Sequence, residues 1–321
     1  MKVLITTVPF AEINYLPIEL LQSVKAEYLI NPLNKKLNEN ELAEMVSDFD
    51  VIIAGTEPIT DFVMRRASKL KMISRVGIGL DSVDLLAAER RGIKVSYTPD
   101  GPAPAVAEMT IGLLITLLRS VQLSNLEMHK GKWNRYFGKR IANSTIGIIG
   151  LGRIGTRVLN RLPVFGTPKL LVNDIAPDPN LDRLFKLEWV DKNTIYRESD
   201  VISLHVPLTK LTKNMIAKKQ LNMMQSDAIL INTSRGGVVN EVDLYNAMKS
   251  GHLSGAAIDV FEEEPYNGSL KEIDRCLLTA HMGSMSIDCR TRMEVEATEE
   301  VVRFINNIPL MNEVPQEEYD F

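Results

Sequence analysis

The stretch Thr145-Ile-Gly-Ile-Ile-Gly150-Leu-Gly152-Arg-Ile-Gly155 decides the fold of this 321-residue chain. A short apolar run, typical of a buried strand, leads into glycines spaced G-x-G-x-x-G, and a helical pattern follows at once. Gly150 would make the tight turn, Gly152 would let the backbone approach a pyrophosphate, and Gly155 would let helix and strand pack closely. The helix N-terminus would offer N–H groups and a positive dipole end to the phosphates. A glycine-rich turn that only packs a helix is the alternative.

An acidic residue favours the dinucleotide site and selects the cofactor. The strand expected at 169–173 ends at Asp174, where a carboxylate can accept hydrogen bonds from an adenosine ribose. The same carboxylate would repel a 2′-phosphate, and no basic residue follows in Ile175-Ala-Pro-Asp178. We therefore predict that the cofactor is NAD rather than NADP.

Apolar runs alternate with helical patterns along the rest of the chain, which is typical of α/β folds with parallel sheets. Strands are expected at 2–7, 50–54, 71–75, 93–96, 145–149, 169–173, 201–205, 228–232, 256–260 and 276–279. Helices are expected at 39–47 and 61–67, and as one long helix from Ala105 to about His129.

Two other segments have a distinctive composition. Prolines at 99, 102 and 104 exclude a helix or a central strand from Thr98–Pro104, which we expect to be a stiff connector between domains. The acidic tail from Glu313 to Phe321 is expected to be loose.

Composition and charge argue against several classes of partner. The net charge is -4, so no basic excess points to nucleic acid or to an anionic membrane. The apolar run Met109–Leu118 is about half the length that spans a bilayer. Only Cys276 and Cys289 are present, which favours a reduced, cytoplasmic protein over a disulfide-bonded one. We expect no metal site.

Six further motifs occur in a fixed order along the chain. They are Arg75-Val-Gly-Ile-Gly-Leu-Asp81, Val106-Ala-Glu108, Ser203-Leu-His-Val-Pro-Leu-Thr209, Ile231-Asn-Thr-Ser-Arg-Gly-Gly237, Asp259-Val-Phe-Glu-Glu-Glu-Pro265 and Thr279-Ala-His-Met-Gly-Ser284. With the glycine motif, they resemble the D-isomer-specific 2-hydroxyacid dehydrogenases, and most nearly the phosphoglycerate dehydrogenase-like branch.

The resemblance implies two doubly wound parallel-sheet domains with the active site in the cleft between them. A Rossmann-type NAD-binding domain would span 103–282. A flavodoxin-like substrate-binding domain would combine 1–102 and 283–321. The reaction implied is hydride transfer between NAD(H) and C2 of a small 2-hydroxy or 2-oxo acid. The helix after Ala105 resembles the family's dimerisation helix, so a homodimer is implied.

Acid–base chemistry at neutral pH usually needs a histidine, and the chain has four. His129 and His252 lie at a helix end and in a turn, where solvated side chains are expected. His205 and His281 both follow strands, and the chemistry of the sequence alone does not separate them. The resemblance selects His281 as the acid–base residue and assigns His205 to the cofactor side.

The resemblance also selects the other catalytic residues. Of the adjacent Glu262, Glu263 and Glu264, it selects Glu264 as the partner of His281, where its charge would favour the imidazolium. Arg235 would hold the substrate carboxylate, because its planar guanidinium can form two parallel hydrogen bonds.

The remaining site residues follow from the same resemblance. Cofactor contacts beyond those named above are implied at Arg153, Ile154, Val206, Pro207, Thr212, Thr233, Ser234, Asp259, His281 and Gly283, with Asp259 at the nicotinamide carboxamide. Substrate contacts are implied at Arg75 and at the backbone of Gly77, Ile78 and Gly79.

Two positions depart from the family pattern. Pro102 replaces an asparagine that is common at the hinge. Ala54 stands where the phosphoglycerate dehydrogenases have a second phosphate-binding arginine, and the nearby Glu57 adds negative charge. We therefore expect phosphohydroxypyruvate to be at best a moderate substrate.

Two alternative functions remain at this stage. One is an NAD-regulated corepressor-like binding protein, whose relatives keep Arg235, Glu264 and His281, although the long extensions of such regulators are absent. The other is a dehydrogenase of another small anion. Glu264 argues against formate, because formate dehydrogenases of this superfamily have glutamine there, whereas phosphite stays open.

Overall fold

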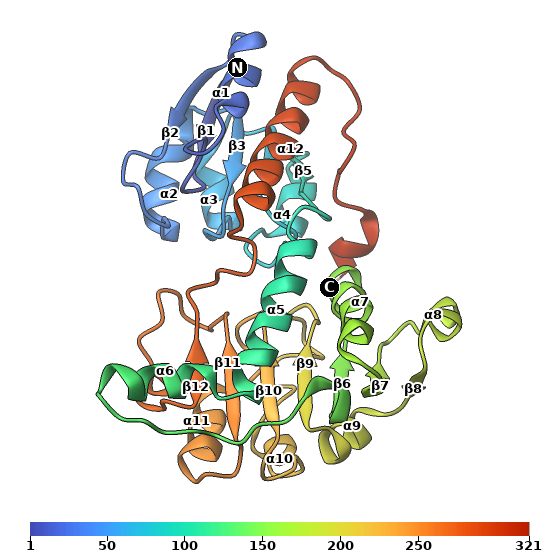
Figure 1. The fold of residues 1–321 in the computed structure, drawn as a ribbon. Coiled ribbons are helices and arrows are strands. Elements are labelled where there is room, and N and C mark those ends of the chain that lie inside the picture. Colours follow the sequence, from blue (N-terminus) through green and yellow to red (C-terminus); the bar gives the residue numbers. More distant parts are fainter. Residues whose placement is uncertain (321) are drawn as a thin grey trace. The chain divides into compact units, whose positions relative to one another are not determined.

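The computed structural model describes residues 1–320 and divides into two compact units. The first unit combines Met1–Pro102 with the chain from Met285 onward, and the second is Ala103–Ser284 (Figure 1). The sequence prediction divides the chain between residues 102 and 103 and between residues 282 and 283.

The first unit is a five-stranded parallel sheet with the strand order β2-β1-β3-β4-β5. This is the flavodoxin-like order, which confirms the predicted fold of this part. Contacts with the sheet place α12, together with α1, on one face, and α2, α3 and α4 pack around the core of the other. The elements are β1 (Lys2–Ile5), α1 (Leu16–Ser23), β2 (Glu27–Ile30), α2 (Glu39–Met45), β3 (Val51–Ala54), α3 (Asp61–Arg66), β4 (Met72–Arg75), α4 (Leu85–Arg90), β5 (Lys94–Ser96) and α12 (Ile287–Ile305).

The second unit is a seven-stranded parallel sheet with the order β12-β11-β10-β9-β6-β7-β8. The order reverses between β6 and β9, as in a Rossmann fold with one added strand, and ligands bind at such a reversal. Its elements are α5 (Ala103–Leu118), α6 (Val121–His129), β6 (Thr145–Ile149), α7 (Arg153–Arg161), β7 (Lys169–Asn173), α8 (Pro179–Leu184), β8 (Leu187–Trp189), α9 (Lys192–Glu198), β9 (Val201–Leu204), α10 (Lys218–Leu221), β10 (Ile229–Asn232), α11 (Glu241–Lys249), β11 (Gly255–Ile258) and β12 (Cys276–Leu278).

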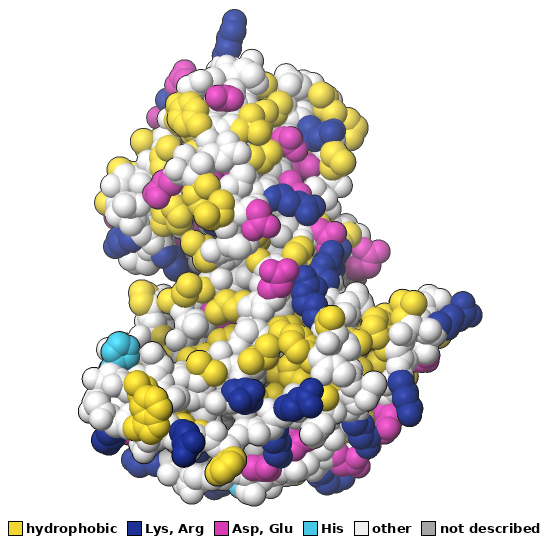
Figure 2. Space-filling model, viewed as in Figure 1, with side chains coloured by type: hydrophobic (Ala, Val, Ile, Leu, Met, Phe, Trp, Pro, Cys, Tyr) yellow, Lys and Arg dark blue, Asp and Glu magenta, His cyan; other side chains and the backbone are white. Residues whose placement is uncertain are grey.

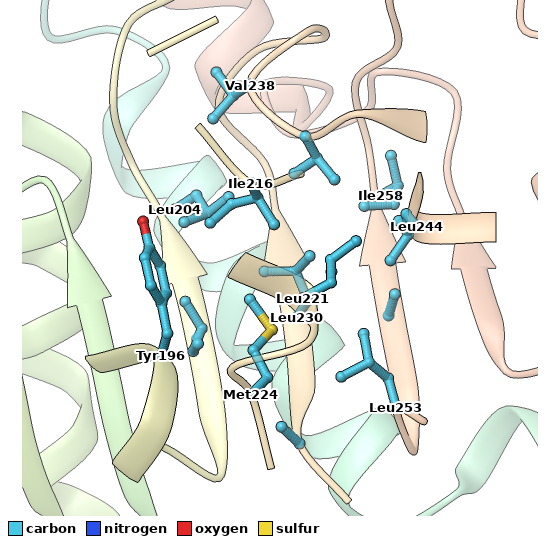
Figure 3. Packing of buried hydrophobic residues seen from close by; sticks show 14 of the residues in the cluster. Tyr196, Leu204, Ile216, Leu221, Met224, Leu230, Val238, Leu244, Leu253 and Ile258 are labelled. Atoms are coloured by element: carbon cyan, nitrogen blue, oxygen red, sulfur yellow. The ribbon is translucent and has the colours of Figure 1, made fainter. Parts of the chain in front are cut away.

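Apolar side chains cover both faces of this second sheet. One face packs against α9, α10 and α11 around Leu204, Leu230 and Leu244, as the close view of Figure 3 shows. The other face packs against α5 and α7. Burial on both faces explains why the central strands are short continuous apolar runs rather than alternating ones.

Two strands were missed in the sequence, and both lie at sheet edges. β2 and β8 are the outermost strands of their sheets, and most of their side chains are partly or fully exposed. A strand that buries little has no apolar run or strict alternation for a sequence pattern to detect.

The prediction of one long helix after Ala105 is wrong, because the helix is broken. α5 and α6 meet at an angle of 65°, and Ser120 between them adopts a left-handed conformation with φ of 50°. α5 buries much of its surface, whereas α6 buries none of its residues, so no shared packing face holds the two in line. Among residues 1–320, no single helix is long and apolar enough to cross a membrane. The bent pair of α5 and α6 reaches the length and apolar composition of a membrane span when its two helices are counted together.

Two expectations about the connector and the tail also change. Pro104 lies in the first turn of α5, where a missing N–H costs no intrahelical hydrogen bond. The tail is ordered rather than loose along its first residues. Glu313 forms an antiparallel bridge with Ser96, and the amide of Val314 donates to Val95 O at 2.9 Å.

Candidate active site

The glycine motif forms the turn between β6 and α7. Gly150 has φ of 95°, and a Cβ on it would overlap the carbonyl of His205. A Cβ on Gly155 would overlap the carbonyl of Gly150, so the helix can approach the strand only through glycine. Gly152 is the N-cap of α7, makes no side-chain cap and has open space where a Cβ would lie. This turn, with Arg153, Ile154 and Gly155 as the first helical residues, therefore fits a pyrophosphate.

Asp174 lies at the end of β7, beside this turn. One oxygen of its carboxylate accepts the Leu151 amide at 2.6 Å, and the other accepts the Ala176 amide at 2.8 Å. Each carboxylate oxygen can accept a further hydrogen bond, so the pair of ribose hydroxyls can still be bound. The two amides hold the carboxylate beside the glycine turn.

His205 follows β9 on the other side of the glycine turn. Its Nε2 lies 2.9 Å from Ser203 Oγ, and its buried Nδ1 has no hydrogen-bond partner within residues 1–320. Burial lowers the pKa of His205 to about 4, so the ring is neutral at physiological pH. A neutral, enclosed imidazole is a poor proton donor, which supports the assignment of His205 to the cofactor side.

The loop after His205 carries three more of the implied cofactor residues. Val206 packs against the apolar core of the unit. The Thr212 hydroxyl accepts the Thr209 amide at 2.7 Å and donates to Pro207 O at 2.6 Å. Thr212 thereby closes this loop into a compact turn beside the strand-order reversal.

His281 and Glu264, the predicted acid–base pair, lie within ion-pair distance of each other. Nδ1 of His281 lies 3.1 Å from both carboxylate oxygens of Glu264, and the Phe261 amide donates to Glu264 Oε1 at 3.2 Å. Because a carboxylate only accepts, Nδ1 carries the proton of this contact, and Nε2 is the nitrogen left for a substrate. The histidine side chain is 36% exposed, so a small molecule can reach it.

Arg235 follows β10, the strand beside β11, whose carboxyl end leads into the Glu264 loop. Its backbone carbonyl accepts Asn232 Nδ2 at 2.9 Å, and its Nη1 donates to Ser234 O at 2.7 Å. A Cβ on Gly236 would overlap the Phe261 carbonyl, so these two loops are in direct backbone contact. The structure therefore brings the loops of Arg235 and Glu264 together at the carboxyl ends of β10 and β11.

Asp259 ends β11 and is 1% exposed. Its Oδ1 accepts the Thr279 hydroxyl at 2.6 Å and the Met282 amide at 2.8 Å, and its Oδ2 accepts the Gly283 amide at 2.9 Å. Thr279 was not singled out in the sequence, because no local pattern pairs a threonine with an aspartate on a neighbouring strand.

The α5 helix supports the last two implied cofactor residues. Thr233 and Ser234 are buried after β10, and the Thr233 hydroxyl lies 2.9 Å from that of Thr110 in α5. This hydrogen bond connects α5 to the segment that follows the carboxyl end of β10.

The implied substrate residues of the first unit lie after β4. Arg75 is 6% exposed, and its Nη1 donates to the Val76 carbonyl. The guanidinium lies over the loop, because a Cβ on Gly77 would be 2.6 Å from Arg75 Nη1. The Gly77 amide donates to Thr98 Oγ1 at 2.8 Å, so this amide is already used within the unit.

Comparison with known proteins identifies the family. The model of the D-isomer specific 2-hydroxyacid dehydrogenase, NAD binding domain, matches residues 111–283. The chain belongs to this family. Its members are NAD-dependent oxidoreductases that act on the CH-OH group of 2-hydroxy acids, and the predicted cofactor and enzyme class are thereby confirmed. Within residues 1–320, no group of three or more His, Cys, Asp or Glu side chains is arranged to hold a metal.

Three similar proteins show how far the likeness extends. A hydroxypyruvate reductase of Thermotoga maritima is 33% identical, over 84% of this chain and 89% of that protein. A D-3-phosphoglycerate dehydrogenase of Methanocaldococcus jannaschii is 35% identical over 88% of this chain, which spans 55% of that protein. The structure of a D-lactate dehydrogenase from Aquifex aeolicus, complexed with NAD and lactic acid, matches with a TM-score of 0.87 and 25% identity, over 98% of this chain and 99% of that one.

Proposed function

We propose that this dehydrogenase acts on an unphosphorylated 2-hydroxy or 2-oxo acid, with Arg235, Glu264 and His281 as its catalytic residues. The observation that carries the proposal is the pairing of His281 with Glu264 beside the Arg235 loop. NADH, when bound, supplies the hydride, and the chain supplies the proton and the binding of the carboxylate.

Each side chain has one step in this proposal. Arg235 binds the substrate carboxylate and so orients C2. Nε2 of His281 donates a proton to the carbonyl oxygen during reduction and takes it back during oxidation. Glu264 accepts from Nδ1 throughout and stabilises the imidazolium. Asp174 holds the ribose, and the glycine turn holds the phosphates.

The anion-binding capacity of the first unit supports an unphosphorylated substrate. A phosphate ester carries a charge of about -1.5 to -2 and normally needs more than one cationic partner. Ala54 ends β3 with no exposed surface and offers no cation. Glu57 is 1% exposed and accepts hydrogen bonds from the Thr6 hydroxyl and, at 2.8 Å, from the Gly55 amide. The Glu57 carboxylate therefore occupies two hydrogen-bond donors that could otherwise bind an anion, and it adds a negative charge at this end of the sheet.

The similar proteins support the same substrate class. The hydroxypyruvate reductase matches this chain over nearly its whole length, whereas the phosphoglycerate dehydrogenase is almost twice as long as the part that matches. An unphosphorylated acid also agrees with the lactic acid that is named in the matched D-lactate dehydrogenase structure.

Steady-state kinetics test the proposal. NADH oxidation is measured with hydroxypyruvate, glyoxylate, pyruvate and phosphohydroxypyruvate, and NAD reduction with phosphite. We expect at least one unphosphorylated acid to equal or exceed phosphohydroxypyruvate in kcat/KM. A preference for phosphohydroxypyruvate above about tenfold, or 1.4 kcal/mol in transition-state binding, would overturn the substrate assignment.

We also infer a homodimer formed through α5, α6 and the chain that follows. Val121 and Met128 are each 50% exposed, Trp133 is 77% exposed and Phe137 is fully exposed. Figure 2 shows hydrophobic side chains at the surface of this part of the chain. Exposed apolar side chains that lie close together are typical of protein–protein interfaces. Light scattering after gel filtration should give about twice the monomer mass, and a Phe137→Glu variant should shift it toward the monomer.

The two cysteines support a cytoplasmic location. Cys276 and Cys289 are both free thiols and both buried. Proteins of oxidising compartments usually pair their cysteines, whereas cytoplasmic ones keep them reduced. Fractionation of cells that make the protein at its natural level should recover it with cytoplasmic markers.

A further inference from the structure

The loop that carries His281 is bound on both sides by one buried carboxylate. Asp259 accepts the Thr279 hydroxyl before the histidine and the Met282 and Gly283 amides after it. Burial raises the pKa of Asp259, and these three donors oppose that rise by stabilising the ionised form. A buried carboxylate with three donors is a strongly held group, so the segment it binds is held as well.

The histidine itself has an unusual backbone. His281 has φ of 51°, in the left-handed region that side chains other than glycine seldom adopt. Its amide donates to the Asp259 carbonyl at 2.8 Å and to the Thr279 carbonyl at 3.0 Å. Both the main-chain carbonyl and the side chain of Asp259 therefore accept hydrogen bonds from the loop that contains His281.

We propose that Asp259 is a positioning residue for His281, which fixes the Thr279–Gly283 loop so that Nδ1 faces Glu264 and Nε2 faces the substrate. This inference rests on the proposed role of His281 as the acid–base group. A residue in a sparsely populated conformation persists only where its surroundings determine it, and the three hydrogen bonds of Asp259 supply that constraint.

The same carboxylate has limited capacity for a cofactor. Oδ1 already accepts two hydrogen bonds, whereas Oδ2 accepts one and retains an acceptor site. A carboxamide N–H would therefore bind Oδ2, the oxygen that also holds Gly283. The Thr279 hydroxyl donates to Oδ1, so it can be removed without removing the acceptor that a cofactor would use.

That separation defines the experiment. Thr279→Val removes the hydroxyl at nearly constant volume, Thr279→Ala repeats the loss with a smaller side chain, and Thr279→Ser keeps the hydroxyl. Thr298→Val is the matched control, because Thr298 is buried and its hydroxyl bonds only to Glu294 O within α12. For each variant, kcat and KM are measured with hydroxypyruvate, the NADH Kd by fluorescence titration, and the four histidine rings by 15N NMR of histidine-labelled enzyme.

We expect Thr279→Val and Thr279→Ala to lower kcat by about tenfold while the NADH Kd and the KM stay within about twofold. Thr279→Ser should restore kcat, Thr298→Val should leave it unchanged, and one histidine signal should shift in the valine and alanine variants. Unchanged kcat in both variants would overturn the proposal. So would a loss of NADH affinity equal to the loss of kcat, because Asp259 would then act through the cofactor.

A further variant separates this inference from the proposed function. His281→Ala should lower kcat by at least about 100-fold. If it does not, the acid–base assignment fails, and the positioning role fails with it. If His281→Ala is inactive and the threonine variants keep full kcat, only the positioning role fails.

Discussion

Both carboxylate oxygens of Glu264 lie 3.1 Å from Nδ1 of His281. A side chain that faces the ring nitrogen symmetrically can hold the imidazole in one orientation in both of its protonation states. It also stabilises the positive charge that the ring carries before it donates a proton. The pair therefore connects the pH dependence of the reaction to a single carboxylate.

Replacing Glu264 with glutamine should move the pH profile of reduction. Glutamine keeps an acceptor for Nδ1–H but loses the negative charge that favours the imidazolium. Proton donation during reduction should therefore fail at a lower pH than in the unmodified enzyme. The profile of kcat/KM with hydroxypyruvate measures this. Glu263→Gln is the control, and a shift in that variant instead would mean that the wrong carboxylate was assigned.

Replacing Arg235 with lysine should be severe although the charge is kept. Lysine is a point charge and loses the two parallel hydrogen bonds that orient a carboxylate. We expect kcat/KM to fall by about 100-fold or more, with the NADH Kd within twofold of the unmodified enzyme. Arg153→Lys, at the phosphate turn, should show the opposite pattern. Equal effects on both parameters would place Arg235 at the cofactor.

His205 should make the nucleotide-binding unit less stable in mild acid. Its pKa is about 4 in the folded protein and near 6.5 when unfolded. Below about pH 6.5 the unfolded chain therefore binds the extra proton, and stability falls as the pH drops toward 4. Between about pH 7 and pH 5 the loss should be about 2 kcal/mol.

Comparing the unmodified protein with a His205 variant separates the contribution of His205 from that of the other titrating groups. Urea unfolding is measured at both pH values for the unmodified protein and for His205→Asn, and the change with pH is compared. The variant should lose less stability on acidification. An equal loss in both would mean that His205 titrates normally, and it would then compete again with His281 for the catalytic role.

Asp174 should set the preference for NADH over NADPH. Asp174→Asn keeps an acceptor for one of the two loop amides and removes the charge that opposes a 2′-phosphate. We expect the ratio of kcat/KM values for NADH and NADPH to fall by about tenfold or more, mainly through KM for NADPH. Glu188→Gln, on the neighbouring strand β8, is a control at an exposed carboxylate and should leave the ratio as it is. Equal use of NADPH by the unmodified enzyme would contradict the prediction.

The sequence determined the parts of the fold that depend on buried residues. The strand before Gly150 and the end of β7 at Asp174 were placed correctly, because apolar runs and glycine spacing are local signals. β2, β8 and the bend at Ser120 were not, since edge strands bury little and the bend depends on where packing stops.

The site shows the same division. The family resemblance selects Glu264 and His281 among their neighbours, and the structure places these two side chains in contact. The resemblance did not reveal that Thr279 is bonded to Asp259, or that the Gly77 amide is used by Thr98. Both contacts join residues about twenty positions apart on adjacent strands, and only the register of the sheet brings them together.

Glu57 should weaken the use of phosphorylated substrates. Its carboxylate accepts from Thr6 and Gly55 after β3. The Ile78–Gly79 loop, which we propose as part of the substrate site, follows the neighbouring strand β4. Glu57→Gln keeps a carbonyl oxygen that can accept from both donors, so the loop should be preserved while the negative charge is lost. Because Glu57 is buried, its charge would be poorly screened by salt and would oppose a phosphate bound near this loop.

We expect Glu57→Gln to raise kcat/KM for phosphohydroxypyruvate by about three- to tenfold and to change that for hydroxypyruvate by less than twofold. Glu27→Gln removes an exposed carboxylate at the opposite, amino-terminal end of β2 and should affect neither substrate. If Glu57→Gln raises kcat/KM equally for both substrates, the carboxylate acts on the 2-oxo acid that they share rather than on the phosphate. If kcat/KM rises for neither substrate, the use of phosphorylated substrates is limited by the missing cation at Ala54, and a positive charge added to this loop would be needed to increase it.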